Sequence, residues 1–360
     1  MLFLHSISLI QFKNYTNRSF DFSKKVTGIC GNNGVGKTNI LDAIHYLCIT
    51  KSYFSSNDAI NVQHGSQGFR IQGLMELQDV TEKVVCILRE NSKKEFAIND
   101  DAYTKFSQHI GRYPCVVIAP DDAVLITGGS EGRRSFLDSL LSQLDAGYLN
   151  SLIQYNRILQ QRNSFLKGAA ESGNLDDSLL AVLDEQLIPK GEEVFKKRRD
   201  FLVSFLPKVK RMYADIAQQD EGLSLLYESR LLDAGFEEIL AATRQKDILL
   251  QRTTAGVHRD DISIQLGQQS FKSIASQGQR KSLLFALKLT ELEVIKAEKK
   301  FAPILLLDDV FEKLDESRIT SLLQNVCVEN EGQVFITDTN TERLTTHLSN
   351  IKADFSIIEL

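Results

Sequence analysis

A glycine-rich stretch near the N-terminus carries the clearest chemistry in this 360-residue chain. Residues 31–38 fit the pattern G-x-x-x-x-G-K-[ST], which is typical of phosphate-binding loops. Glycines let the backbone amides of such a loop curl around phosphate oxygens, because a Cβ atom would block the approach. Lys37 would reach the β- and γ-phosphates, and the Thr38 hydroxyl would hold Mg²⁺. We therefore predict that ATP is bound by the whole loop: Gly31, Asn32, Asn33, Gly34, Val35, Gly36, Lys37 and Thr38.

Two adjacent acids, Asp308 and Asp309, end the fully apolar run 304–307. A carboxylate in this position holds Mg²⁺ through water in P-loop ATPases, and the next acid can orient the attacking water. An apolar run followed by two acids can also be a plain strand end. Combined with the loop at 31–38, however, the pair favours a hydrolytic site. We predict that Asp308 is a metal ligand with Thr38, and that Asp309 and Lys37 are catalytic.

A third piece of chemistry is the stretch Ser276-Gln277-Gly278-Gln279, which precedes an amphipathic helical pattern. Ser276 fits the N-cap of that helix. A helix N-terminus is itself an anion site, so a cap and a contact to a γ-phosphate are compatible. A further short stretch, Lys313-Leu314-Asp315, lies a few residues beyond the acidic pair.

The elements that must position these residues follow a mixed α/β pattern. A short apolar strand at 26–30 precedes the loop, and apolar residues at helical spacing follow it. Another strand is expected at 2–10, and alternating apolar runs predict an antiparallel meander over 67–99.

From residue 122 to about 235 the spacing of apolar residues is helical, with a loop at 167–174. We therefore predict an ATPase lobe formed by 1–120 and 245–360, with a compact helical lobe inserted at 121–244.

Composition limits the classes of partner and compartment. The net charge is −5, so a nucleic-acid partner would have to be met by local basic patches. The five cysteines are far apart and form no C-x-x-C pair, which is typical of reduced core residues in a cytosolic protein. The chain opens without a signal-peptide pattern, and no apolar run approaches membrane-spanning length. We expect a cytoplasmic protein without a membrane anchor.

Candidate DNA contacts are the four consecutive cations Lys196, Lys197, Arg198 and Arg199, with more cations at 208, 210 and 211. A solvated helix face, partly neutralised by neighbouring acids, is the alternative. Arg133 and Arg134 could contact DNA or pair with Glu131 or Asp138. For 258–261, His-Arg-Asp-Asp, we favour a structural or lobe-coupling network over a metal site.

The order of these motifs resembles the ATPase heads of the ABC superfamily. About 270 residues separate Lys37 from the acidic pair, and the Ser276–Gln279 stretch precedes that pair by about thirty residues. Within the superfamily the chain resembles the SMC-like branch and, more closely, the RecF family. The blocks that carry this resemblance are Leu9–Tyr15, Gly31–Ile44, Ala119–Asp122, Arg133–Asp138, Gly256–Asp261, Ser276–Gln279 and Pro303–Asp315.

This resemblance implies a slow, DNA-dependent ATPase without nuclease or helicase activity. It also implies binding to duplex DNA and to duplex–single-strand junctions at gaps, and action with RecO and RecR to load the RecA recombinase. ATP would join two copies of the chain, with Ser276, Gln277, Gly278 and Gln279 of one copy meeting the nucleotide of the other.

The chain departs from the general ABC pattern at several positions. Asp309 stands where most of these ATPases have glutamate, and Thr337 stands where transporter ATPases have a histidine. Phe54 stands where the RecF family commonly has a basic residue, which argues against a phosphate contact by that loop. Two alternatives remain open, a small-molecule P-loop kinase and a non-hydrolysing scaffold with nucleotide as a structural cofactor. The kinase would place its acids close behind the loop and would give the Ser276–Gln279 stretch no role.

Overall fold

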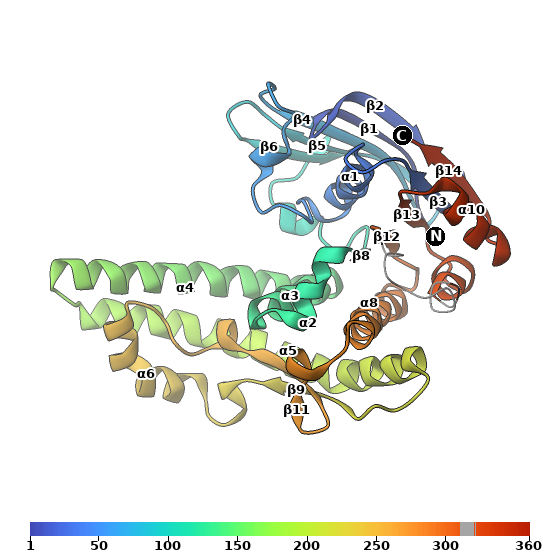
Figure 1. The fold of residues 1–360 in the computed structure, drawn as a ribbon. Coiled ribbons are helices and arrows are strands. Elements are labelled where there is room, and N and C mark those ends of the chain that lie inside the picture. The colour runs from blue at the N-terminus through green and yellow to red at the C-terminus, as the bar shows by residue number, and fades with distance from the viewer. Residues whose placement is uncertain (310–319, 321) are drawn as a thin grey trace. The chain divides into compact units, whose positions relative to one another are not determined.

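A computed structural model describes residues 1–309, 320 and 322–360, which fold into two compact units. The first unit contains 1–122 and 288–360, and the second contains 123–287 (Figure 1). The second unit therefore extends to Leu287, past the predicted boundary at 244. The reason is that strand β9 (Leu223–Glu228) pairs along its whole length with β10 (Asp261–Leu266), which holds the later segment in the second unit.

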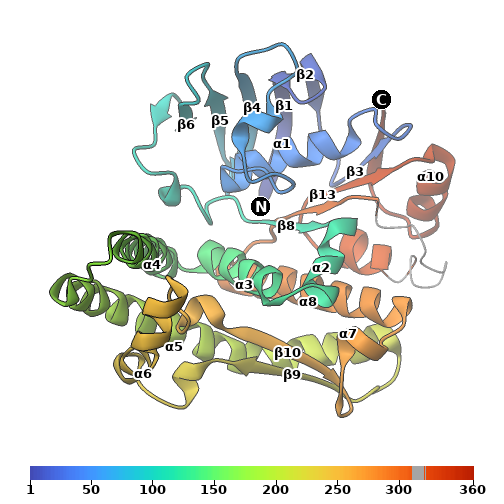
Figure 2. The ribbon, with the colours of Figure 1, turned by 60° about the vertical axis from the view of Figure 1, so that its left-hand side comes forward.

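The first unit is built on two sheets with the helix α1 (Lys37–Ile49) between them (Figure 2). One sheet is antiparallel, in the order β2-β1-β4-β5-β6-β7. Its strands are β1 (Leu2–Phe12), β2 (Tyr15–Asp21), β4 (Phe69–Leu77), β5 (Val80–Leu88), β6 (Lys94–Ile98) and β7 (Asp101–Ala102). The meander predicted over 67–99 is thus confirmed.

The other sheet is entirely parallel, in the order β14-β3-β13-β12-β8. Parallel strands buried on both faces are rich in apolar residues, and four of these five strands are buried at every residue. The strands are β3 (Val26–Cys30), β8 (Cys115–Ile118), β12 (Ile304–Leu307), β13 (Val334–Asp338) and β14 (Phe355–Glu359), and α10 (Thr341–Asn350) contacts β14. Since all strands run the same way, their carboxyl ends meet at one edge of the sheet.

The second unit is mainly helical, as predicted, and its two longest helices lie side by side (Figure 1). The predicted loop at 167–174 begins too early, because α4 continues through Ala169-Ala170-Glu171, which are strong helix formers. It ends at Gly173, whose φ of 68° suits glycine. The helices are α2 (Val124–Thr127), α3 (Ser130–Leu144), α4 (Ala146–Ser172), α5 (Asp177–Ala217), α6 (Phe236–Leu250) and α7 (Phe271–Ile274).

A small antiparallel sheet completes this unit, in the order β11-β10-β9, with β11 at Gln269–Ser270. Helix α8 (Gln277–Lys299) begins in the second unit and ends in the first. Among the described residues no helix is both long and apolar enough to cross a membrane. All five cysteines are buried, which confirms the prediction that they are core residues.

Candidate functional site

The phosphate-binding loop connects β3 to α1 at the carboxyl edge of the parallel sheet. Gly36 has a φ of 116°, and a Cβ atom there would lie 2.5 Å from the Asn14 side-chain nitrogen. Only glycine fits that position. The ammonium group of Lys37 donates to the carbonyl oxygens of Gly31 (2.8 Å) and Asn32 (3.1 Å). The lysine is thus folded back over its own loop and is only 4% exposed.

The turn between β1 and β2 holds this loop from outside. The Asn14 side-chain amide donates to the Val35 carbonyl at 2.7 Å, and the Tyr15 hydroxyl donates to the Gly36 carbonyl at 3.1 Å. Burial raises the pKa of Tyr15 to about 12, which keeps this phenol protonated as a donor. Sequence reasoning used these two residues only as part of a family block, without a role. The signal that could have found them is their position at the hairpin turn, inside the Leu9–Tyr15 block.

A hydroxyl and a carboxylate from distant parts of the chain meet beside the loop. The Thr38 hydroxyl lies 3.0 Å from both carboxylate oxygens of Asp308, which follows β12. The Thr337 hydroxyl on β13 donates to one of these oxygens at 2.8 Å. Burial raises the pKa of Asp308, and the hydrogen bonds from Thr337 and Thr38 oppose that shift.

These donors fit a magnesium ion that is shared with a nucleotide. Mg²⁺ prefers oxygen ligands and usually takes one or two from protein, with phosphates and water completing the set. Thr38 and Asp308 supply such oxygens at one point. In the part of the chain that the structure describes, no group of three or more His, Cys, Asp or Glu could hold a metal by itself. The arrangement therefore suits Mg²⁺ bound together with phosphate better than an all-protein metal centre.

Asp309 leaves the strand in a left-handed backbone conformation, with a φ of 42°. Its amide donates to the Thr337 hydroxyl at 2.9 Å. Both predicted acids are thus at the carboxyl edge of the sheet, where β13 separates their strand β12 from β3, the strand that leads into the loop. The stretch Lys313-Leu314-Asp315 lies outside the described residues.

Ser276 and Gln279 form a reciprocal cap at the start of α8, in the second unit. The Ser276 hydroxyl accepts from the Gln279 amide at 3.2 Å, and the Gln279 side-chain oxygen accepts from the Ser276 amide at 2.8 Å. This is a capping box, and the predicted N-cap role of Ser276 is confirmed. The Gln279 side-chain amide also donates to Glu221 at 3.0 Å. The contact of this stretch with a nucleotide on another copy stays a prediction.

The basic stretch at 196–199 divides into one buried and three accessible cations. Arg198 is only 1% exposed, and it is held by ion pairs with Asp138 (2.6 Å) and Asp260 (3.1 Å), so its prediction as a DNA contact is wrong. The ion pairs of the other cations are Lys197 with Asp145 and Arg199 with Asp200, while Lys196 lies on the exposed side of α5. DNA contact by these three residues stays a prediction.

Arg133 pairs with Asp261 at 2.7 Å, so neither predicted partner, Glu131 or Asp138, was correct. Asp138 instead pairs with Arg198. The histidine of the same block, His258, lies 2.7 Å from the Tyr155 hydroxyl, and burial lowers its pKa to about 4. The predicted structural network at 258–261 is confirmed.

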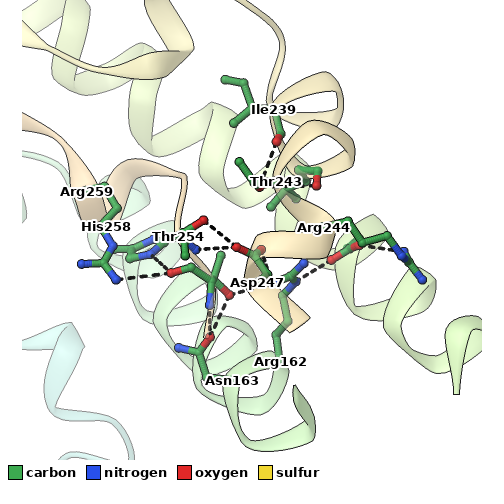
Figure 3. A network of polar contacts seen from close by, with 12 residues as sticks. Arg162, Asn163, Ile239, Thr243, Arg244, Asp247, Thr254, His258 and Arg259 are labelled. Carbon is green, nitrogen blue, oxygen red and sulfur yellow. Dashed lines mark hydrogen bonds and ion pairs between the residues drawn. The ribbon is translucent and has the colours of Figure 1, made fainter. Parts of the chain in front are cut away.

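This network continues into a second buried arginine, Arg162, which is fully buried (Figure 3). Its guanidinium pairs with Asp184 at 2.6 Å and Asp247 at 2.8 Å. Asp247 also accepts from the Thr254 backbone amide and hydroxyl (Figure 3). These contacts join helices α4, α5 and α6 and the segment before His258 within the second unit.

Comparison with known proteins identifies full-length relatives. A family model described as the RecF/RecN/SMC N terminal domain matches residues 3–355. The chain is 41% identical over 357 residues to the DNA replication and repair protein RecF of Flavobacterium johnsoniae, which is 99% of this chain and 99% of that protein.

Two solved structures are also similar to the whole chain or nearly so. The recombination mediator protein RecF with ATPrS, of the RecFOR pathway, has a TM-score of 0.89 at 27% identity and covers 100% of this chain and 96% of that one. The same kind of protein with ATP has a TM-score of 0.87 at 28% identity and covers 94% of this chain and 92% of that one.

Proposed function

Because the chain belongs to the RecF family of SMC-like ATPases, we propose that it is an ATP-dependent DNA-binding protein of recombinational repair and replication restart. The observation that carries the proposal is the meeting of Thr38 and Asp308 beside the phosphate-binding loop. Residues 270 positions apart in the sequence are brought together there, and they supply the two protein oxygens that a P-loop ATPase uses for Mg²⁺. Slow hydrolysis of ATP follows from the aspartate at 309.

Different residues of the chain would bind the phosphates, hold Mg²⁺ and orient the attacking water. The loop amides bind phosphate oxygens, and the Lys37 ammonium exchanges its two carbonyl partners for the charged phosphates. Thr38 and Asp308 would hold Mg²⁺, which when bound neutralises charge on the β- and γ-phosphates. Asp309 would orient the attacking water. An aspartate is one methylene shorter than the usual glutamate, which supports a slow turnover.

The further steps of the proposal concern assembly. ATP joins two copies, and Ser276, Gln277, Gly278 and Gln279 of one copy contact the γ-phosphate held by the other. The capping box supports this step, because it sets the amides at the start of α8 in helical geometry, where anions bind. The dimer binds duplex and gapped DNA through surface cations and acts with RecR and RecO in loading RecA. The solved relatives of the RecFOR pathway support that partnership.

The first experiment measures ATP hydrolysis with and without gapped duplex DNA. Lys37→Ala removes the charge on the phosphates and leaves the loop amides in place, so ATP affinity should fall by about tenfold or more. Lys93→Ala is the matched control, since this lysine lies on an exposed turn of the antiparallel sheet. Equal ATP affinity of wild type and Lys37→Ala in calorimetry would disprove the assignment of the loop. DNA-independent phosphoryl transfer to a metabolite would favour the kinase.

A second experiment tests the composite site. Lys37→Ala disables one half of it and Ser276→Arg blocks the other, so a mixture can form heterodimers with one intact site. ATPase activity should reappear on mixing. If hydrolysis needs both sites intact, mixing will restore no activity even though dimers form. Sedimentation of the wild type with ATP therefore tests dimer formation directly. A wild type that hydrolyses ATP while it stays monomeric at every ATP concentration would refute the dimer.

A further inference from the structure

Thr337 occupies the central position of the candidate hydrolytic site, although it was not among the predicted site residues. It lies on β13, whose neighbours in the sheet are β3, which leads into the phosphate-binding loop, and β12, which ends at the two acids. The residue is fully buried. Its side chain is therefore fixed within the sheet rather than placed on a loop.

The Thr337 hydroxyl makes two hydrogen bonds of opposite sense. It donates to a carboxylate oxygen of Asp308 at 2.8 Å and accepts from the backbone amide of Asp309 at 2.9 Å. A hydroxyl has one proton and two lone pairs, so a single oxygen atom can fill both roles. An apolar residue of similar shape, such as valine, could make neither hydrogen bond.

The second of these bonds acts on an unusual backbone. Asp309 has a φ of 42°, in the left-handed region that non-glycine residues seldom adopt. Such a conformation persists where its surroundings determine it. The Thr337 hydroxyl holds the amide of this residue at the point where the chain leaves β12.

We propose that Thr337 is the positioning residue of the Asp308–Asp309 pair, because one buried hydroxyl sets the rotation of the first carboxylate and the backbone direction of the second acid. The proposal rests on the proposed ATPase function. Thr337 itself touches neither nucleotide nor metal in this scheme. It couples the orientation of the Mg²⁺ ligand to the placement of the group that orients water.

A simpler explanation is that a buried threonine only needs partners for its hydroxyl. Thr27, on the adjacent strand β3, provides the comparison. It is also fully buried, and its hydroxyl has no hydrogen-bond partner among the described residues. A threonine hydroxyl at this depth of the sheet is therefore compatible with the fold whether or not it is bonded.

The test compares Thr337→Val, Thr337→Ser and Thr27→Val. Valine keeps the shape of threonine and removes the hydroxyl, and serine keeps the hydroxyl. Thr337→Val should lower kcat by about tenfold or more, since a hydrogen bond to a charged group is lost together with the bond that holds the Asp309 amide. It should also raise the Mg²⁺ concentration needed for half-maximal ATP binding several-fold. Thr337→Ser should restore both quantities to within about threefold of wild type, and Thr27→Val should change neither.

Thermal unfolding without nucleotide separates positioning from folding. Equal loss of thermal stability in Thr337→Val and Thr27→Val, with kcat and Mg²⁺ dependence unchanged, would overturn the inference. A wild type without ATPase activity would instead count against the proposed function. In that case the Mg²⁺ dependence of ATP binding decides: a several-fold change in Thr337→Val that serine reverses supports the inference, and no change refutes it.

Discussion

Replacing Arg198 should destabilise the protein far more than replacing its neighbour Arg199, although the two are adjacent in one basic stretch. The Arg198 guanidinium is buried and donates hydrogen bonds to four groups: the Tyr148 hydroxyl, the Val257 carbonyl, Asp138 and Asp260. Arg198→Met keeps much of the side-chain volume and leaves both carboxylates without their cation. Arg199, by contrast, pairs with Asp200 and lies over the Phe195 ring on an exposed part of α5.

The expected magnitudes differ by several-fold. Breaking a buried ion pair by removing one partner costs about 3–5 kcal/mol, whereas an exposed pair contributes about 0–1 kcal/mol. The second unit spans Ala123–Leu287. In a domain of that size 1 kcal/mol shifts the unfolding midpoint by about 2–4 °C. Arg198→Met should therefore lower the midpoint by roughly 6–20 °C, and Arg199→Met by less than about 4 °C.

The assay is thermal unfolding followed by circular dichroism, with DNA binding measured below the midpoint. Burial raises the pKa of Asp260 even with Arg198 present. An acid with a raised folded pKa stabilises the fold below its unfolded pKa and loses that contribution as pH rises. The deficit of Arg198→Met should therefore be larger at pH 8 than at pH 5. Equal midpoints for the two variants would show that Arg198 is not the buried centre of this network.

Three further predictions concern other parts of the molecule. Asp308→Asn should weaken Mg²⁺-dependent ATP binding, whereas Asp309→Asn should keep binding and stop hydrolysis; calorimetry and phosphate release separate the two. Burial lowers the pKa of His109 from 6.5 to about 4, so the unfolded state binds its proton more tightly than the folded state does. As the pH falls from 6.5 to 4, the free energy of unfolding should therefore fall by up to about 1.4 kcal/mol per pH unit. Urea titrations at several pH values should show that the free energy of unfolding depends less steeply on pH in His109→Gln than in the wild type. Lys208→Ala and Lys210→Ala should weaken DNA binding and each reduce the salt dependence by about one unit, while ATP affinity stays unchanged.

Local patterns explain why the site around the loop could be predicted from sequence. The apolar strand at 26–30, the glycine spacing and the helical spacing after Lys37 are each encoded within a few residues, and the structure contains the strand and the helix. The antiparallel meander likewise follows from alternation and turn residues that are close in sequence.

Long-range pairing explains what could not be predicted. Strand β9 pairs with β10, and Leu223 lies opposite Leu266, so a helix-like apolar spacing was overridden by a distant partner. The burial of Arg198 likewise depends on Asp138 and Asp260, which are 60 and 62 residues away. The four cations alone do not distinguish the one that points into the core, although Arg198 lies four residues from both Val194 and Leu202 on the buried face of α5. Thr337 was missed as a site residue for the same reason, since its two partners follow another strand.

The backbone conformation that the Thr337 hydroxyl holds can explain why residue 309 is aspartate rather than glutamate. Aspartate is one of the few non-glycine residues enriched in the left-handed region, and its side chain can bond locally to the backbone, which glutamate does less well. A chain that leaves β12 with a φ of 42° therefore favours the shorter acid, even though it reaches water less easily. On this view the slow turnover that we propose would result from the backbone that the Thr337 hydroxyl holds. Asp309→Glu should bind ATP as the wild type does and hydrolyse it no faster, because the gain in reach is offset by the cost of the backbone. A faster Asp309→Glu enzyme would break the link between the two residues.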